Sequence, residues 1–168
     1  MRIPIVDEND NIIKIADGKG EIDLNPELIY RVSSLWITNS KQEVLLARRA
    51  WNKIHDPGKW GPAVAGTVEE GETYESNILK EAQEELGLKN IKPVLGEKRL
   101  KKGKWNYFSQ KFNLVLDQDV SQFKIQENEV AEIKWFSEKE LTKELKEHPE
   151  DFLKGIYEYV KEKYANQD

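Results

Sequence analysis

Three glutamates, Glu81, Glu84 and Glu85, lie in the short stretch KEAQEELGL that runs from Lys80 to Leu88. On a helix, residues three or four positions apart face each other, so these carboxylates would repel one another unless something offset their charge. A hard divalent cation such as Mg²⁺ binds a few carboxylate oxygens and often shares them with substrate phosphates. A divalent cation bound among the three carboxylates would therefore offset their repulsion, and such a site is compatible with a small phosphorylated ligand.

A solvated acidic helix face is the alternative interpretation. Runs of charge usually lie on surfaces, and Lys80 is placed to pair with Glu84 at the i, i+4 spacing. A surface helix would normally intersperse lysines among three such acids, however. The acids also follow the loop GTVEEGE (66–72), whose glycines let the backbone approach neighbouring atoms closely. Both features favour the metal site.

The acids need a helix to hold them, and the sequence predicts one from Thr73 to Leu86. Thr73 suits an N-cap, Glu75 suits the positive end of the helix dipole, and Gly87 stands where a helix ends. A rotation of about 100° per residue places four apolar side chains on one arc, namely Ile78, Leu79, Ala82 and Leu86. The acids fall on the adjoining arc, at the edge of the face that we expect to pack on a sheet.

Alternating apolar runs predict strands around this helix. The runs are a hairpin within 1–17, then 29–38, 43–50, 63–66, 91–100, 105–116 and 129–136. Residues 18–27 are interpreted as a polar link and 51–62 as a surface loop. C-terminal helices are predicted over 137–166, the last with an apolar stripe of Phe152, Ile156, Tyr159 and Val160. This order predicts one α/β domain over residues 1–168, with helices packed on a mixed sheet.

Composition narrows the function classes. The 168 residues are 38% hydrophobic and 34% charged, with a net charge of −5, which argues against a nucleic acid polymer as partner. The chain has no Cys, which excludes disulfides, thiolate nucleophiles and cysteine metal sites. The N-terminus meets charge too early for a signal peptide, and no apolar run reaches the ~20 residues of a membrane helix. We therefore expect a cytoplasmic protein without a membrane partner.

The stretch GTVEEGETYESNILKEAQEELGL, residues 66–88, resembles the Nudix box, the loop–helix signature of the Nudix hydrolases. One position departs from the signature, because Lys80 stands where the family usually has Arg. Lysine keeps the charge but loses the planar, bidentate fork of arginine. The resemblance implies a Nudix-type α/β/α sandwich with a mixed β-sheet. It also implies MutT-like hydrolysis of a diphosphate with Mg²⁺ or Mn²⁺ as cofactor.

The same resemblance implies roles for individual residues. The metal ligands would be the backbone carbonyl of Ala65 and the side chains of Glu81, Glu84 and Glu85. Gly66, Glu72 and Lys80 would support them, with Glu72 bracing Lys80. The general base that activates the attacking water would be Glu85 or a glutamate outside the box. Three glutamates in QENEVAEIKWF are the outside candidates, Glu127, Glu129 and Glu132, and Glu129 is favoured.

A wider resemblance, over roughly residues 3–142, links the chain to the Nudix branch of isopentenyl-diphosphate isomerase. Arg49 and Lys53 match basic positions of that branch and would bind a substrate phosphate, with a solvated strand edge as the alternative. The isomerase has a Cys just before the box, where this chain has Ala65. Its metal site also uses acids on a later strand, and residues 102–116 contain none.

Three functions follow, and the first is favoured. They are hydrolysis of a nucleoside diphosphate derivative, isopentenyl-diphosphate isomerisation, and nucleotide binding by a regulator with weak catalysis, which Lys80 keeps open. The partner is in each case a small-molecule diphosphate. The N-terminal hairpin either covers a sheet edge or joins a homodimer interface.

The aromatic side chains and His55 are interpreted mainly as packing or surface residues. Trp60 is interpreted as a packing residue. Trp51, Trp105 and Tyr107 are interpreted as core or rim packing, with stacking on a base or another planar group as the alternative. His55 is expected at the surface.

Overall fold

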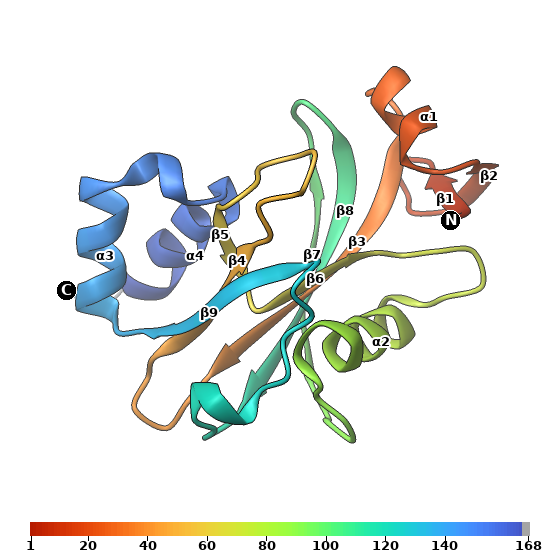
Figure 1. Cartoon of the computed structure of the whole chain (residues 1–168). Coiled ribbons are helices and arrows are strands. Elements are labelled where there is room, and N and C mark those ends of the chain that lie inside the picture. Colours follow the sequence, from red (N-terminus) through yellow and green to blue (C-terminus); the bar gives the residue numbers. More distant parts are fainter. Residues whose placement is uncertain (166–168) are drawn as a thin grey trace.

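One twisted mixed sheet forms the centre of the computed structural model, which describes residues 1–165 (Figure 1). The strands are β1 (Ile3–Val6), β2 (Ile12–Ala16), β3 (Ile29–Thr38), β4 (Val44–Arg49), β5 (Trp60–Pro62), β6 (Val64–Thr67), β7 (Val94–Lys101), β8 (Asn106–Val115) and β9 (Val130–Phe136). The helices are α1 (Lys19–Leu24), α2 (Tyr74–Leu86), α3 (Glu138–Glu147) and α4 (Lys154–Tyr164), with short 3₁₀ turns at Val120–Gln122 and Pro149–Asp151.

Strand β3 organises the sheet. It runs antiparallel to β4 and β6 and parallel to β8, with which it pairs along its whole length from Ile29↔Asn106 to Thr38↔Val115. Strand β4 continues the sheet through antiparallel pairs with β5 and β9, and β7 pairs with β8. The expected mixed sheet is therefore confirmed.

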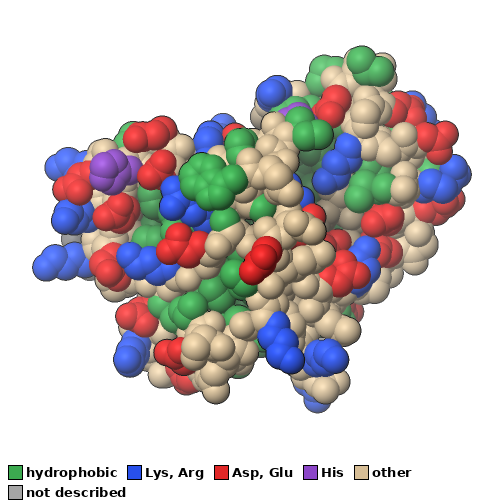
Figure 2. Space-filling model, viewed as in Figure 1, with side chains coloured by type: hydrophobic (Ala, Val, Ile, Leu, Met, Phe, Trp, Pro, Cys, Tyr) green, Lys and Arg blue, Asp and Glu red, His purple; other side chains and the backbone are tan. Residues whose placement is uncertain are grey.

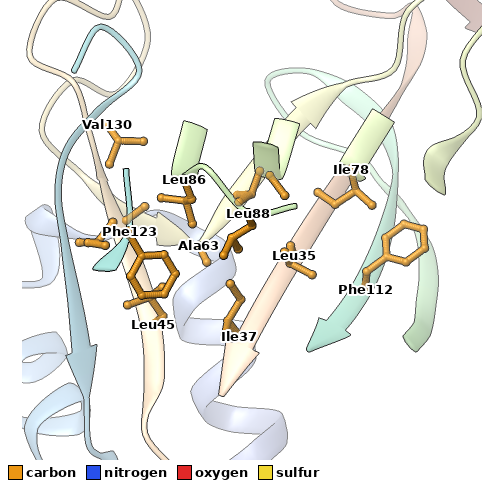
Figure 3. Close-up of a cluster of buried hydrophobic side chains, with 14 residues drawn as sticks. Leu35, Ile37, Leu45, Ala63, Ile78, Leu86, Leu88, Phe112, Phe123 and Val130 are labelled. Atoms are coloured by element: carbon orange, nitrogen blue, oxygen red, sulfur yellow. The ribbon is translucent and has the colours of Figure 1, made fainter. Parts of the chain in front are cut away.

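Alternate residues of β3 and β4 supply the two layers of the core, because successive side chains of a strand point to opposite faces. Leu35 and Ile37 face α2, where they pack with Ile78, Ala82 and Leu86 (Figure 3). On the other face, a cluster joins the sheet to the C-terminal helices through Trp36, Val44, Leu46, Leu141 and Ile156. Helix α2 and the pair α3–α4 thus cover opposite faces of the sheet, which gives the α/β/α arrangement.

The predicted central helix is confirmed. Thr73 caps α2 by accepting a hydrogen bond from the Ser76 amide, and the helix ends at Gly87, whose φ of 69° is the left-handed conformation that suits glycine. Three residues of the predicted packing arc, Ile78, Ala82 and Leu86, are buried. The helix therefore presents its apolar arc to the sheet and leaves the acids beside it.

Three local predictions were wrong. Residues 18–27 contain the six-residue helix α1. Because α1 buries only Ile22, it shows no periodic apolar pattern in the sequence. The expected 51–62 loop contains β5, which pairs with β4 because Trp60 is buried there. The last predicted helix is broken before Lys154, since the Leu153 amide bonds to the Trp60 carbonyl. Residue 166, the end of the predicted helical range 137–166, lies outside the described residues.

The β1–β2 hairpin is anchored to the rest of the fold through its turn. Asp10 accepts from Arg31 Nε at 2.6 Å, from Lys98 Nζ at 2.7 Å and from the Tyr74 hydroxyl at 3.0 Å. These contacts join the hairpin to β3, β7 and the first turn of α2. Within residues 1–165, no helix combines the length and the apolar character that crossing a membrane requires.

Candidate active site

Helix α2 lies against β6 and β3 at a point where no side chain fits between them. A Cβ atom at Gly66 would lie 2.5 Å from Glu81 Cγ and 2.8 Å from Asn77 Oδ1. The buried Asn77 side chain fastens the contact, because its amide nitrogen donates to the Thr67 carbonyl at 3.1 Å and Ser33 Oγ donates to its Oδ1 at 2.5 Å. The glycine and the asparagine therefore set the height of the acidic helix above the sheet.

Lys80 is held by carboxylates of the preceding loop. Its ammonium lies 2.6 Å from Glu72 Oε1, 3.4 Å from Glu69 Oε1 and 3.6 Å from Glu81 Oε1. Burial alone would raise the pKa of Glu72, but hydrogen bonds from Lys80, the Glu69 amide and Asn77 outweigh burial and lower that pKa. The loop before the helix is thus fixed to it by charge-assisted hydrogen bonds.

The acids of α2 lie in unequal environments. Glu84 is exposed, whereas Glu85 is 9% exposed. Burial, followed by the charges of Glu81 and Glu129, raises the pKa of Glu85 to about 8, although Lys53 and Arg49 oppose the change. Burial also raises the pKa of Glu81, and the charge of Glu84 adds to that effect.

The loop before β9 brings a fourth carboxylate, that of Glu129, near the C-terminal end of α2. The Gln126 amide donates to the Glu85 carbonyl at 3.0 Å, and the Ala50 amide donates to the Glu129 carbonyl at 3.0 Å. The Glu129 side chain forms an ion pair with Lys53. The other two outside candidates lie apart, since Glu132 pairs with Arg48 at 3.7 Å and Glu127 is exposed.

Basic side chains border the acids on the β4 side. Arg49 Nε donates to the His55 carbonyl at 3.1 Å, which holds the β4–β5 loop. Arg48 lies over the rings of Trp51 and Trp60, at 4.9 and 5.6 Å from their centroids. Trp60 is buried, as its packing interpretation predicts, whereas Trp51 is 65% exposed and covers Arg48 rather than core. Acidic and basic side chains lie next to one another over much of this face (Figure 2).

The residues present fit a hard divalent cation in donor type and charge. Glu81 and Glu85 supply carboxylate oxygens, and their pKa values are raised mainly by burial and further by neighbouring carboxylates. Among residues 1–165, no hydrogen bond or salt bridge of another side chain reaches the Glu85 carboxylate. In the described part of the chain, no three His, Cys, Asp or Glu side chains already stand together as a formed metal site. Ala65, the expected carbonyl ligand, lies exposed on β6 beside Gly66.

Sequence reasoning missed the buried part of this site. Asn77 and Ser33 contact each other beneath Glu81, and neither was singled out. The helix periodicity gave no signal for Asn77, because it falls about 100° from Ile78, on the arc of the acids rather than on the apolar arc. A buried amide with several partners commonly fixes local geometry.

Comparisons with known proteins agree with this architecture. A NUDIX domain is matched over residues 28–156. An uncharacterized Nudix hydrolase of Yersinia pestis is 29% identical over 159 residues, which are 92% of this chain and 82% of the relative. Isopentenyl-diphosphate Delta-isomerase 1 of Photorhabdus laumondii is 34% identical over 86 residues, 51% of this chain. The match spans about half of that isomerase, 48% of its length.

Solved structures show the same fold. DR0079 from Deinococcus radiodurans matches with a TM-score of 0.80 over 98% of this chain and 99% of that chain, at 22% identity. A MutT protein from Methanosarcina mazei matches with a TM-score of 0.60 over 83% of this chain and 96% of the other, also at 22% identity. The chain belongs to the Nudix family. Family and fold together support a hydrolase of MutT-like architecture.

Proposed function

We propose that this protein hydrolyses a diphosphate linkage in a nucleoside diphosphate derivative, with Mg²⁺ or Mn²⁺ as cofactor. The observation that carries the proposal is Glu85, a residue only 9% exposed, close to the charges of Glu81 and Glu129, whose carboxylate forms no hydrogen bond with another described side chain. Removing most of an ionised side chain from water without a partner is unfavourable, so chains seldom keep such a group without a function. A divalent cation, when bound, would offset that charge, polarise the diphosphate and acidify a water molecule.

The acids of α2 have distinct roles in the proposal. Glu81, Glu84 and Glu85 hold the cation together with the Ala65 carbonyl. Gly66 lets Glu81 approach the sheet, and the Lys80–Glu72 pair fixes the loop that precedes the helix. These supporting contacts matter because a displacement of about 1 Å in a catalytic group can lower a rate about a hundredfold.

Substrate phosphate lies between the acids and the basic side chains of β4 and its loop. Arg49 and Lys53 are the proposed phosphate ligands, and both lie close enough to Glu85 to lower its pKa. Lys53 forms an ion pair with Glu129. A phosphate that binds Lys53 competes for that ammonium and leaves the Glu129 carboxylate able to accept a proton from the attacking water.

Isomerase activity is the second candidate, because part of the chain is similar to an isopentenyl-diphosphate isomerase. The site here has Ala65 and an intact acidic helix, which suits diphosphate hydrolysis better than proton transfer to an alkene. Binding without turnover is the third candidate. Lys80 contacts three carboxylates. The presence of Lys at this position, where the family usually has Arg, therefore gives no support for a loss of catalysis.

A substrate panel tests the proposal. The full chain is incubated with nucleoside diphosphates, their sugar and nucleoside conjugates, and isopentenyl diphosphate, with Mg²⁺ or Mn²⁺, and products are separated by chromatography. We expect phosphate-containing products from one nucleotide class, loss of turnover in Glu84→Gln, and normal turnover in Glu75→Gln, a control on the exposed first turn of α2. Interconversion of isopentenyl and dimethylallyl diphosphates, or tight binding without turnover, would favour the other candidates.

The proposal extends to the domain organisation, the location and the partners of the protein. We propose a single domain over residues 1–168 that works in the cytoplasm on a small molecule, without a nucleic acid polymer or a membrane as partner. The β1–β2 hairpin extends the sheet beyond β3 through the Val6↔Ile29 pair, so its outer strand β2 is the edge available to a second copy in a homodimer. Size-exclusion chromatography with light scattering measures the oligomeric state.

A further inference from the structure

A cavity of about 170 Å³ opens next to the candidate active site. Its lining comes from α1, the start of β3, the ends of β4 and β6, the β4–β5 loop and the β7–β8 connection. The residues that matter here are Asp23, Tyr30, Arg49, His55, Thr67 and Trp105. Figure 2 shows a histidine, in purple, among hydrophobic side chains close to the position of α1 in Figure 1.

The cavity adjoins the proposed diphosphate site through two shared residues. Arg49 lines the cavity and also lowers the pKa of Glu85 by its charge. Thr67 lines the cavity, and its carbonyl accepts the hydrogen bond from Asn77 beneath Glu81. A substrate whose diphosphate lies at Glu81 and Arg49 therefore has its remaining part directed toward this cavity.

The walls combine flat aromatic surface with a carboxylate. The rings of His55 and Trp105 lie edge to face, with centroids 4.8 Å apart, and Tyr30 lies 5.6 Å from Tyr107. Asp23 Oδ2 is 3.4 Å from His55 Nε2, a long contact that leaves the carboxylate able to accept further hydrogen bonds. Flat ligands with hydrogen-bond donors suit such a site, because aromatic rings stack on them and the acid accepts their protons.

The volume of the cavity and the Asp23 carboxylate limit the ligands that it can bind. Ligands of drug size take pockets of about 300–1,000 Å³, so this cavity accepts one ring system rather than a whole nucleoside. An isoprenoid chain would remove the Asp23 carboxylate from water without offering it a donor, which is unfavourable.

We propose that this cavity binds the base of the nucleotide substrate and prefers bases that carry an exocyclic amino group, with Asp23 accepting from that group and Trp105 stacking on the ring. The proposal rests on the proposed function, because it takes the diphosphate to lie at the acidic helix. Loss of one hydrogen bond to a charged group corresponds to roughly a tenfold change in affinity or more.

Matched substrate pairs test the preference. Cytidine diphosphate carries an amino group where uridine diphosphate has a carbonyl oxygen, and guanosine diphosphate carries an amino group that inosine diphosphate lacks. We expect kcat/KM to be about tenfold higher for the amino member of each pair, and Asp23→Asn to remove that preference. Asp56→Asn is the control, because Asp56 pairs with Lys59 in the β4–β5 loop and does not line the cavity. Equal rates within each pair, or a preference that persists in Asp23→Asn, would overturn the proposal.

A binding measurement separates this proposal from the proposed hydrolysis. Cytidine and uridine monophosphates are titrated into the metal-free chain by calorimetry, which requires no turnover. A cytidine preference that Asp23→Asn abolishes supports the cavity even if no diphosphate is hydrolysed. Hydrolysis without any base preference overturns the cavity and leaves the hydrolase. Trp105→Leu is the second variant, expected to weaken binding of all bases about tenfold through lost stacking; unchanged binding would contradict the role of Trp105.

Discussion

The side chain of Lys53 forms an ion pair with that of Glu129, which joins the β4–β5 loop to the residues before β9. Both residues also lie near the buried Glu85, whose pKa Glu129 raises and Lys53 lowers. The pair places the proposed phosphate ligand Lys53 and the proposed general base Glu129 in contact with each other at one edge of the proposed site. Because the two side chains are only partly buried, at 26% and 38% exposed, a substrate phosphate can replace Glu129 as the partner of Lys53.

Glu129→Gln tests the assignment of the general base. Glutamine keeps the size of the side chain but cannot take a proton, so kcat should fall about 10²- to 10⁴-fold with little change in KM. Glu127→Gln is the comparison, because Glu127 is exposed in the same loop. Steady-state kinetics on the substrate found in the panel measures both. A large loss in Glu127→Gln and none in Glu129→Gln would show that the assignment is wrong.

Gly66→Ala tests the close approach of α2 to the sheet. The added Cβ would meet Glu81 Cγ at 2.5 Å, so the Glu81 side chain has to move. We expect a drop in kcat of at least about tenfold and a loss of stability of about 1–3 kcal/mol, because both the Glu81 side chain and the hydrogen-bonded Asn77 amide have to shift. Gly103→Ala is the control, since no atom lies within 4 Å of a Cβ there. Activity assays and urea unfolding report the two effects, and full activity in Gly66→Ala would contradict the role of Glu81.

The sequence predicts the central helix and the long strands because their signals are local. The apolar arc of Ile78, Ala82 and Leu86 and the caps Thr73 and Gly87 define α2 because each acts locally. The sequence does not predict the short elements α1 and β5. Helix α1 buries only one residue and so shows no apolar pattern. Strand β5 forms because Trp60 packs against Phe136 and Phe152, which are distant in sequence.

The sequence predicts only those parts of the candidate site whose residues are neighbours along the chain. The acids of α2 are spaced by the helix, so the sequence predicts their cluster. The pairing of Lys53 with Glu129, the amide of Asn77 beneath Glu81, and the cavity beside α1 depend on contacts between distant segments. No spacing in the chain encodes such contacts, and a sequence pattern therefore cannot reveal them.

Glu85 should make the metal-free protein less stable at alkaline pH. Its pKa is raised from 4.5 to about 8, so the folded chain holds the proton more tightly than the unfolded chain. Protonated Glu85 stabilises the folded chain fully below about pH 4.5, and this stabilisation is lost as the pH rises through about 8. Each unit of difference between the folded and unfolded pKa corresponds to roughly 1.4 kcal/mol in the free energy of unfolding. Glu85→Gln should remove this loss.

Urea unfolding with a chelator at pH 5 and pH 9 measures the effect. Glu84→Gln is the matched control, because Glu84 is exposed on the same helix. We expect Glu85→Gln to be more stable than the parent chain at pH 9, by a few kcal/mol at most, and similar to it at pH 5. An identical pH dependence in the two variants would contradict the burial of a charge at Glu85.

Lys80 should tolerate arginine but not an apolar residue. Its ammonium contacts three carboxylates, and Glu72 is only 19% exposed, so Lys80→Met leaves Glu72 without its nearest cation. We expect a loss of about 1–3 kcal/mol of stability and reduced kcat in Lys80→Met. Lys80→Arg should retain or exceed parent activity, since the planar fork can bind two carboxylates. Thermal unfolding and kinetics are the measurements, and indifference to Lys80→Met would exclude a bracing role.

The most direct test is a Mn²⁺ titration of the full chain, followed by electron paramagnetic resonance of the free ion. The account predicts that the parent chain takes up Mn²⁺, that Mg²⁺ competes, and that uptake is lost when Glu81, Glu84 and Glu85 are changed together to glutamine but kept in Glu75→Gln. If the parent chain takes up no Mn²⁺, or the triple variant binds it as the parent does, then the acids of α2 do not form the metal site.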